Sequence, residues 1–198
     1  MNRTLLALLL AATTSCSCTL AQSGPTGAGL AISGTVSGSV PAQARVGGFV
    51  IDSSGNPVAE LVSVAVTGGR FGLELPSVTP PGGALSTLRP ASIFWPGLLE
   101  PVSVSGQAST ADLKFYVYND SNGNGRRDDT EPLQETVAFV GKSLLVVSYA
   151  TGAAQVNAAR GFQVNLKPGW NGLLIEVGKV VRVSSSNSIG GVTLNVQR

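Results

Sequence analysis

The sequence contains no histidine, and only two of its 198 residues are cysteines. Histidine is the commonest general base and a frequent transition-metal ligand, so its absence excludes a histidine-activated serine nucleophile and a histidine-ligated zinc site. Both cysteines, Cys16 and Cys18, lie near the amino terminus. The rest of the chain therefore contains no disulfide, and another device has to stabilise it.

Charged residues are also scarce. Only 12% of the residues are Asp, Glu, Lys or Arg, the formal net charge is +2, and no run of basic residues occurs. Binding to nucleic acid requires a cluster of cations that neutralises phosphates, so nucleic acid is not an expected partner. Glycine occupies 25 positions, and Ser, Thr, Asn and Gln have to supply much of the polar surface. This composition favours an exported β-protein over a cytosolic enzyme.

Residues 1–21 have the pattern of a signal peptide. Arg3 gives the amino terminus a positive charge, and residues 5–12 form an apolar stretch. The stretch is too short to span a bilayer, which requires about 20 residues. It suits the hydrophobic region of a secretory signal, so the sequence predicts an exported protein.

The end of this signal resembles the lipobox of bacterial envelope lipoproteins, here Thr13-Thr14-Ser15-Cys16. In that family cleavage before the cysteine leaves a lipidated amino terminus. The resemblance implies lipidation of Cys16, and contact with the membrane only through the lipid. Thr13 stands where the lipobox usually has leucine. Cleavage after Ala21 is the alternative, and it gives a secreted protein.

The chain after the signal peptide has the pattern of an all-β protein. Residues 22–30 are rich in Gly, Ser and Pro and are interpreted as a flexible tether. Beyond them, short runs of β-branched, aliphatic and aromatic residues alternate with turn residues, and no helical stripe occurs. Strands are predicted at 46–52, 61–66, 70–75, 102–104, 113–118, 137–140, 144–149, 162–166, 173–177, 180–183 and 192–196. We expect one β-sandwich, of transthyretin or immunoglobulin type, over residues 31–198.

Two small sandwiches, 31–98 and 102–198, are the alternative division of the chain. Residues 76–101 hold six of the eleven prolines, as a linker between domains would. They also carry many large apolar side chains, which a solvated linker would expose. We therefore expect a long loop that packs onto a single domain.

Residues 46–58 followed by 69–76 resemble carboxypeptidase regulatory-like domains. The matching features are the turn Asp52-Ser-Ser-Gly55-Asn-Pro57 and the strand Gly69-Arg-Phe-Gly-Leu. The resemblance covers about 30 residues and consists of turn and core positions. It implies a transthyretin-like sandwich and says nothing of an activity.

Residues 120–131 fit the calcium-loop pattern D-x-[DN]-x-[DN]-G-x5-E at every defined position. Calcium takes about seven hard oxygen ligands, which a short loop supplies by coiling around the ion. The predicted Ca2+ ligands are Asp120, Asn122, Asn124, the backbone carbonyl of Arg126, Asp128 and Glu131. Gly125 permits the sharp bend, and Asp129 is expected to be solvated. The alternative is an ordinary polar turn, but a turn has no reason to place acids at positions 1, 9 and 12.

The flanks of this loop predict strands rather than helices. Residues 113–118 alternate as a strand does, and Pro132 directly after Glu131 disfavours a helix. The string from Tyr118 to Glu131 resembles the calcium loops of dockerins and of the B-type repeats of serine–aspartate surface adhesins. The resemblance implies a calcium-binding loop. Because the region after the signal peptide lacks disulfides, we expect calcium to stabilise the β-domain in their place.

The sequence contains candidates for two other functions. Trp95 and Trp170 are candidates for a carbohydrate- or protein-binding surface, with Trp170 at the tip of a turn at 167–171. A carboxylate-dependent hydrolase is a weaker alternative, and its candidate acids are Glu74, Glu100, Asp112 and Glu176. No spacing favours any pair of these acids, so we do not expect an enzyme. The sequence does not indicate the oligomeric state.

Overall fold

The computed structural model describes residues 29–197, and regular structure in this range is β-strand with three short 3-10 turns. The strands are β1 Leu30–Ser37, β2 Ala44–Ile51, β3 Pro57–Ala65, β4 Arg70–Leu75, β5 Ser86–Thr87, β6 Ser103–Ser105, β7 Ser109–Asn119, β8 Gln134–Val140, β9 Ser143–Ala150, β10 Ala154–Asn157, β11 Gln163–Leu166, β12 Gly169–Val177, β13 Val181–Ser186 and β14 Ser188–Val196. The prediction of an all-β fold is confirmed. The signal peptide, its cleavage sites and Cys16 lie outside the described residues.

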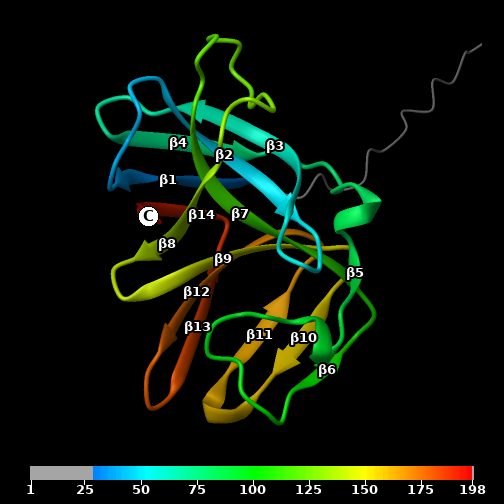
Figure 1. Ribbon diagram of the computed structural model, residues 1–198. Helices are drawn as coiled ribbons and strands as arrows, with labels where there is room; N and C mark the ends of the chain where they lie inside the picture. Colours follow the sequence, from blue (N-terminus) through cyan, green and yellow to red (C-terminus); the bar gives the residue numbers. More distant parts are fainter. Residues whose placement is uncertain (1–28, 198) are drawn as a thin grey trace, which may run out of the picture.

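The β-sandwich contains two sheets, and the larger one folds around a core of its own (Figure 1). The larger runs in the order β13-β12-β9-β7-β8-β14-β1-β4; β2 and β5 also pair with β7, and β3 pairs with β2. The smaller contains β11, β10 and β6. Every pairing is antiparallel except that of β1 with β14. The pairings of β1 with β14 and of β2 with β7 join the two halves of the alternative two-domain division within one sheet.

The start of the domain differs slightly from the prediction. Residue 30 was assigned to the tether, but Leu30 is the first residue of β1 and is 1% exposed. The run Leu-Ala-Ile that it begins gives β1 its alternating buried positions. Neither β1 nor β10 was predicted, because small and polar residues break their apolar alternation.

Two cores divide the interior, because alternate residues of the central strands face opposite sides. The first is enclosed by the larger sheet, and the odd-numbered residues of β7 from Ala111 to Val117 belong to it. The second lies between the end of that sheet and the smaller sheet. Leu88, Ile93 and Trp95 from the proline-rich segment are buried in this second core. The prediction of a long loop packed onto the domain is confirmed.

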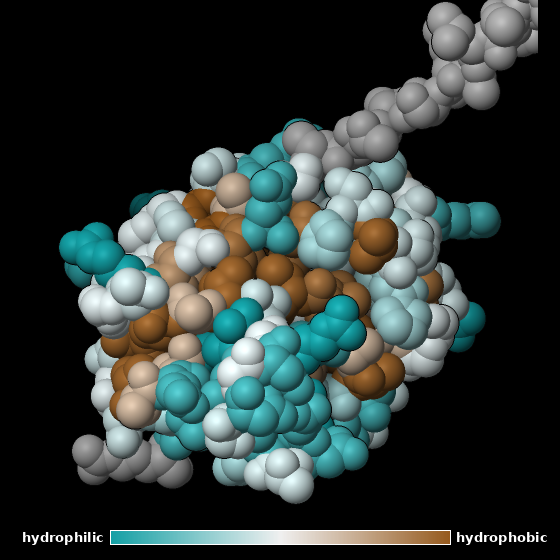
Figure 2. All heavy atoms as spheres, turned by 90° about the horizontal axis from the view of Figure 1, so that it is seen from above, coloured by the Kyte–Doolittle hydropathy of each residue, from teal (hydrophilic) through white to brown (hydrophobic). Residues whose placement is uncertain are grey.

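The surface mixes polar and apolar side chains, in keeping with the small share of charged residues in the sequence. Figure 2 shows apolar side chains reaching the surface between polar ones across the face seen from above. Within residues 29–197, no helix is long and apolar enough to cross a membrane.

Candidate metal centre

The predicted calcium loop connects β7 to β8 and projects from one end of the sandwich (Figure 1). It begins directly after Asn119, the last residue of β7, and no helix follows it. Leu133 closes it by packing against a small apolar cluster of Phe49, Tyr116 and Tyr118. The prediction of a loop between strands is confirmed.

Side-chain oxygens of four predicted ligands accept hydrogen bonds from backbone N–H groups within the loop. The Gly125 N–H donates to Asp120 Oδ2 at 2.9 Å, Asn124 N–H to Asn122 Oδ1 at 3.0 Å, Arg126 N–H to Asn124 Oδ1 at 2.8 Å, and Asp128 N–H to Glu131 Oε2 at 3.1 Å. These local bonds fix the course of the loop backbone around its polar side chains. Gly125 has a φ of +82°, the left-handed conformation that glycine adopts without strain.

The two carboxylates at the ends of the loop are the most buried polar groups in it. Asp120 is 5% exposed and Glu131 is 2% exposed. The backbone N–H of Asp128, together with the N–H and hydroxyl of Ser121, lowers the pKa of Glu131 and keeps it ionised. In contrast, Asp120 Oδ1 is buried and has no hydrogen-bond partner. A buried carboxylate oxygen without a partner is costly, so this atom requires a cation or a donor.

The predicted ligands in the middle of the loop meet at Asp128. Its Oδ2 accepts a hydrogen bond from the side-chain amide of Asn122 at 2.5 Å and from that of Asn124 at 2.8 Å. In this conformation two amide N–H groups face the carboxylate, whereas bound calcium needs the amide oxygens to face it. Accordingly, within residues 29–197 no three Asp, Glu, Cys or His side chains are gathered as in a metal site.

Asp129 points away from the loop centre. Its side chain is fully exposed and pairs with Arg127 at 3.1 Å. The expectation that Asp129 is solvated is confirmed.

A polar network on β2, β3 and β7 supports the loop from below. The guanidinium of Arg45 lies 3.7 Å from Asp120 Oδ2 and also donates to Ser63. Tyr118 Oη lies 2.7 Å from Ser63 Oγ and donates to Glu60 Oε1 at 2.9 Å. Burial raises the pKa of Tyr118 to about 12, so it remains a donor at neutral pH.

Glu60 completes the link between this network and the loop, because its second oxygen accepts the backbone N–H of Arg127 at 3.1 Å. Sequence reasoning missed Arg45 and Glu60. They lie about 70 residues before the loop and reach it only through the pairing of β2 with β7 and of β3 with β2. The one sequence signal was the presence of charged residues within otherwise apolar strands.

The alternative sites are arranged differently from the expectation. Trp170 lies within β12 rather than at a turn tip, is 7% exposed, and packs edge-on against Tyr149. Trp95 is 5% exposed. Both rings fill cores and so form no exposed platform, which corrects the assignment of these residues to a binding surface. Of the four candidate hydrolase acids, Asp112 alone lines a pocket described in the structure.

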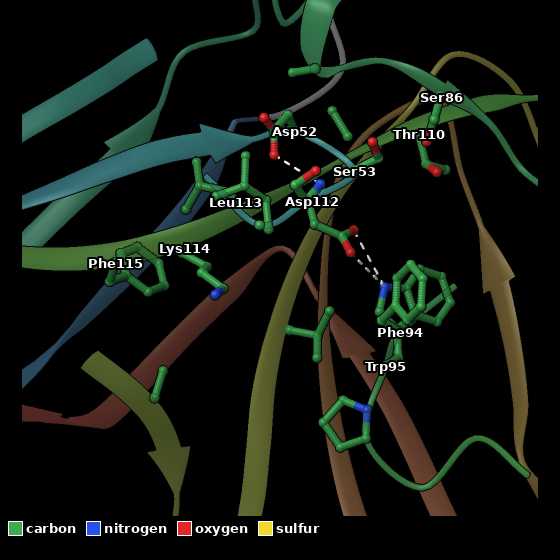
Figure 3. A pocket seen from close by; sticks show the side chains of 18 of the residues that line it. Asp52, Ser53, Ser86, Phe94, Trp95, Thr110, Asp112, Leu113, Lys114 and Phe115 are labelled. Carbon is green, nitrogen blue, oxygen red and sulfur yellow. Dashed lines mark hydrogen bonds between the residues drawn. The ribbon is translucent and has the colours of Figure 1, made fainter. Parts of the chain in front are cut away.

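That pocket is a groove of about 750 Å³ beside β7 (Figure 3). Asp112 and Lys114 project into it from the face of β7 opposite the first core. Figure 3 shows the Asp112 carboxylate pointing toward the indole nitrogen of Trp95, whose N–H donates to both carboxylate oxygens at 3.1 and 3.3 Å. Phe94, the next residue, is 79% exposed at the groove.

Comparisons with known proteins identify no relative. No family model matches the chain, and neither a curated protein nor a solved structure matches it. The resemblances to lipoproteins, to carboxypeptidase regulatory-like domains and to adhesin and dockerin loops therefore stay predictions from the sequence.

Proposed function

We propose that this protein is a calcium-stabilised β-sandwich module of the cell envelope, with the ion held in the loop of residues 120–131. The observation that carries the proposal is the buried Asp120 Oδ1 atom, which has no partner in a loop whose spacing suits calcium. Asp120 Oδ2 accepts the Gly125 N–H and lies near Arg45, so an ion beside Oδ1 would supply the partner that this second oxygen lacks. Asp120, Asn122, Asn124, Asp128, Glu131 and the Arg126 carbonyl would hold the ion.

Calcium supplies no reaction chemistry in this proposal. Its role is to bind the oxygens of a loop that joins two central strands, as a disulfide would join two segments. The absence of cysteine from residues 19–198 supports this role, because an exported domain of this kind has no covalent crosslink available. The hydrogen bonds already present within the loop reduce the ordering that binding requires.

The envelope location rests on residues 1–18 alone. The short apolar stretch and the sequence around Cys16 support export and lipid attachment.

Isothermal titration of the purified full-length chain with calcium tests the proposal. We expect one site with a dissociation constant on the order of 10 µM. Asp120→Asn should abolish the binding, because it removes the buried charge while it keeps the size of the side chain. Asp129→Asn is the matched control and should bind calcium as the unchanged chain does. No binding at about 1 mM calcium, or equal affinity in Asp120→Asn, would contradict the proposed site.

A further inference from the structure

The groove beside β7 carries an excess of negative charge. Its ionisable lining residues are three acids, Asp52, Asp112 and Glu135, and one base, Lys114. Lys114 pairs with Glu135 at 2.6 Å, so these two charges cancel. Asp52 and Asp112 remain, and neither takes part in an ion pair described in the structure. The groove is therefore negative although the whole chain has a formal charge of +2.

Asp112 is unusual because its charge is poorly compensated inside the molecule. Its hydrogen-bond partner is neutral: the Trp95 indole N–H donates to both carboxylate oxygens, while Ser148, the cross-strand neighbour of Asp112 on β9, is an uncharged residue. Burial raises the pKa of Asp112 in spite of the Trp95 N–H donor. A carboxylate in this setting gains more from a cationic partner than an exposed one does, because water screens it less.

The aromatic residues at the same end of the groove suit an organic cation. Trp95 holds the carboxylate in place from the second core, while Phe94 leaves most of its ring uncovered. A cation within about 6 Å of an aromatic ring face is attracted by the electrons of the ring. An exposed ring beside a half-buried carboxylate is thus complementary to a cation with an apolar body.

From this geometry we propose that the groove binds a small organic cation, either a protonated amine or a quaternary ammonium ion. Asp112 forms the charge pair, Phe94 covers the apolar part of the ligand, and Asp52 adds to the attractive potential. The second uncompensated acid favours a ligand with two positive charges over a ligand with one. This site is separate from the calcium loop and does not depend on it.

Calorimetric titrations with putrescine, choline and a neutral disaccharide test this proposal, with the full-length chain in saturating calcium. We expect putrescine to bind more tightly than choline, the disaccharide not to bind, and the affinity for putrescine to fall as sodium chloride is added. Asp112→Asn should weaken putrescine binding at least tenfold, and Phe94→Ala roughly three-fold. Asp129→Asn removes an acid outside the groove and should change nothing.

Three results would overturn the assignment. The first is no binding of either amine at about 10 mM, where a ligand of even weak affinity is detected. The second is binding that Asp112→Asn leaves unchanged in a variant whose circular dichroism spectrum matches that of the original chain. The third is binding of the disaccharide with the same dependence on Asp112, which would make the groove a site for neutral hydroxyl-bearing ligands.

Discussion

The carboxylates at the two ends of β7 differ in how far neighbouring groups compensate their charge. Asp120 has a counter-charge nearby in Arg45, and Glu131 accepts several N–H and O–H donors. Asp112 has only neutral donors, so burial is the main influence on its ionisation. The free energy of unfolding of the ligand-free protein should therefore change when Asp112 is replaced by a neutral residue.

Asp112→Asn should stabilise the ligand-free protein at pH 7 by about 1 kcal/mol, because the neutral amide avoids the cost of burying a charge. Because the pKa of Asp112 is raised in the folded protein, its protonation contributes to the free energy of unfolding. This contribution is fully present below the pKa of the unfolded chain, near 3.8, and is lost as the pH rises through the pKa of the folded protein. The increase in stability caused by Asp112→Asn should consequently become smaller toward acid pH. Urea unfolding at several pH values measures it. A variant less stable than the original chain at pH 7 would show that the charge is compensated.

At the scale of elements, the contact of β1 with β14 depends on one glycine. Between Ile32 and Gly34 the register advances by two residues on β1 and by three on β14, so β14 bulges there. A Cβ atom added to Gly34 would lie 1.8 Å from the carbonyl oxygen of Val192. The two strands can approach this closely only because Gly34 has no side chain.

Gly34→Ala should therefore destabilise the protein by about 3 kcal/mol or more, since neither backbone can move without breaking the pairing. Gly72→Ala is the matched control. A Cβ at Gly72, on the neighbouring β4, meets only Ser33 at 3.9 Å. Thermal unfolding should show a large loss for the first variant and little change for the second. Equal effects of the two substitutions would refute the close approach.

The link from β3 to the calcium loop gives a second test at this scale. Glu60→Ala removes the acceptor of both the Tyr118 hydroxyl and the Arg127 N–H. It should cost about 1 to 3 kcal/mol, because the part-buried Arg127 N–H loses its partner and the Tyr118 hydroxyl keeps only Ser63. Calcium affinity should fall as well, although Glu60 is not among the proposed ligands. Titration calorimetry and urea unfolding measure the two effects, and unchanged affinity would show that the loop binds calcium without support from β3.

The sequence predicted those elements that local patterns define. The alternation at 70–75 matches β4 residue for residue. The flanks of the calcium-loop pattern correctly indicated strands on both sides of that loop, but the strand predicted at 137–140 begins three residues after the start of β8 at Gln134. The parallel pairing of β1 with β14 depends on residues about 160 positions apart, so no local pattern indicates it. Trp95 and Trp170 were candidates for a binding surface, and the packing of segments distant in the sequence covers both. Arg45 and Glu60 were missed for the same reason.

For the whole molecule, the proposed envelope location predicts an effect of cysteine substitutions that does not depend on the folded domain. Cys16→Ala should release the protein into the medium, because it removes the atom that would carry the lipid. Cys18→Ala should leave it attached to the membrane. Fractionation of cells that express each variant measures this. Release of both variants, or of neither, would contradict the lipobox interpretation.

Calcium binding in one loop should also stabilise the entire sandwich, since β7 pairs with β2, β5, β8 and β9. With a dissociation constant on the order of 10 µM, about 1 mM calcium adds roughly 2.7 kcal/mol to the free energy of unfolding. For a domain of this size, that corresponds to an increase of about 5 to 10 °C in the midpoint of thermal unfolding.

The most direct measurement is thermal unfolding in a chelator and in about 1 mM calcium, followed by circular dichroism, for the original chain, Asp120→Asn and Asp129→Asn. We predict a higher midpoint in calcium for the original chain and for Asp129→Asn, and no difference for Asp120→Asn. Trypsin cleavage at Arg126 and Arg127 should slow in calcium for the same two proteins. Equal midpoints for the original chain in chelator and in calcium would contradict the central claim that calcium stabilises this domain.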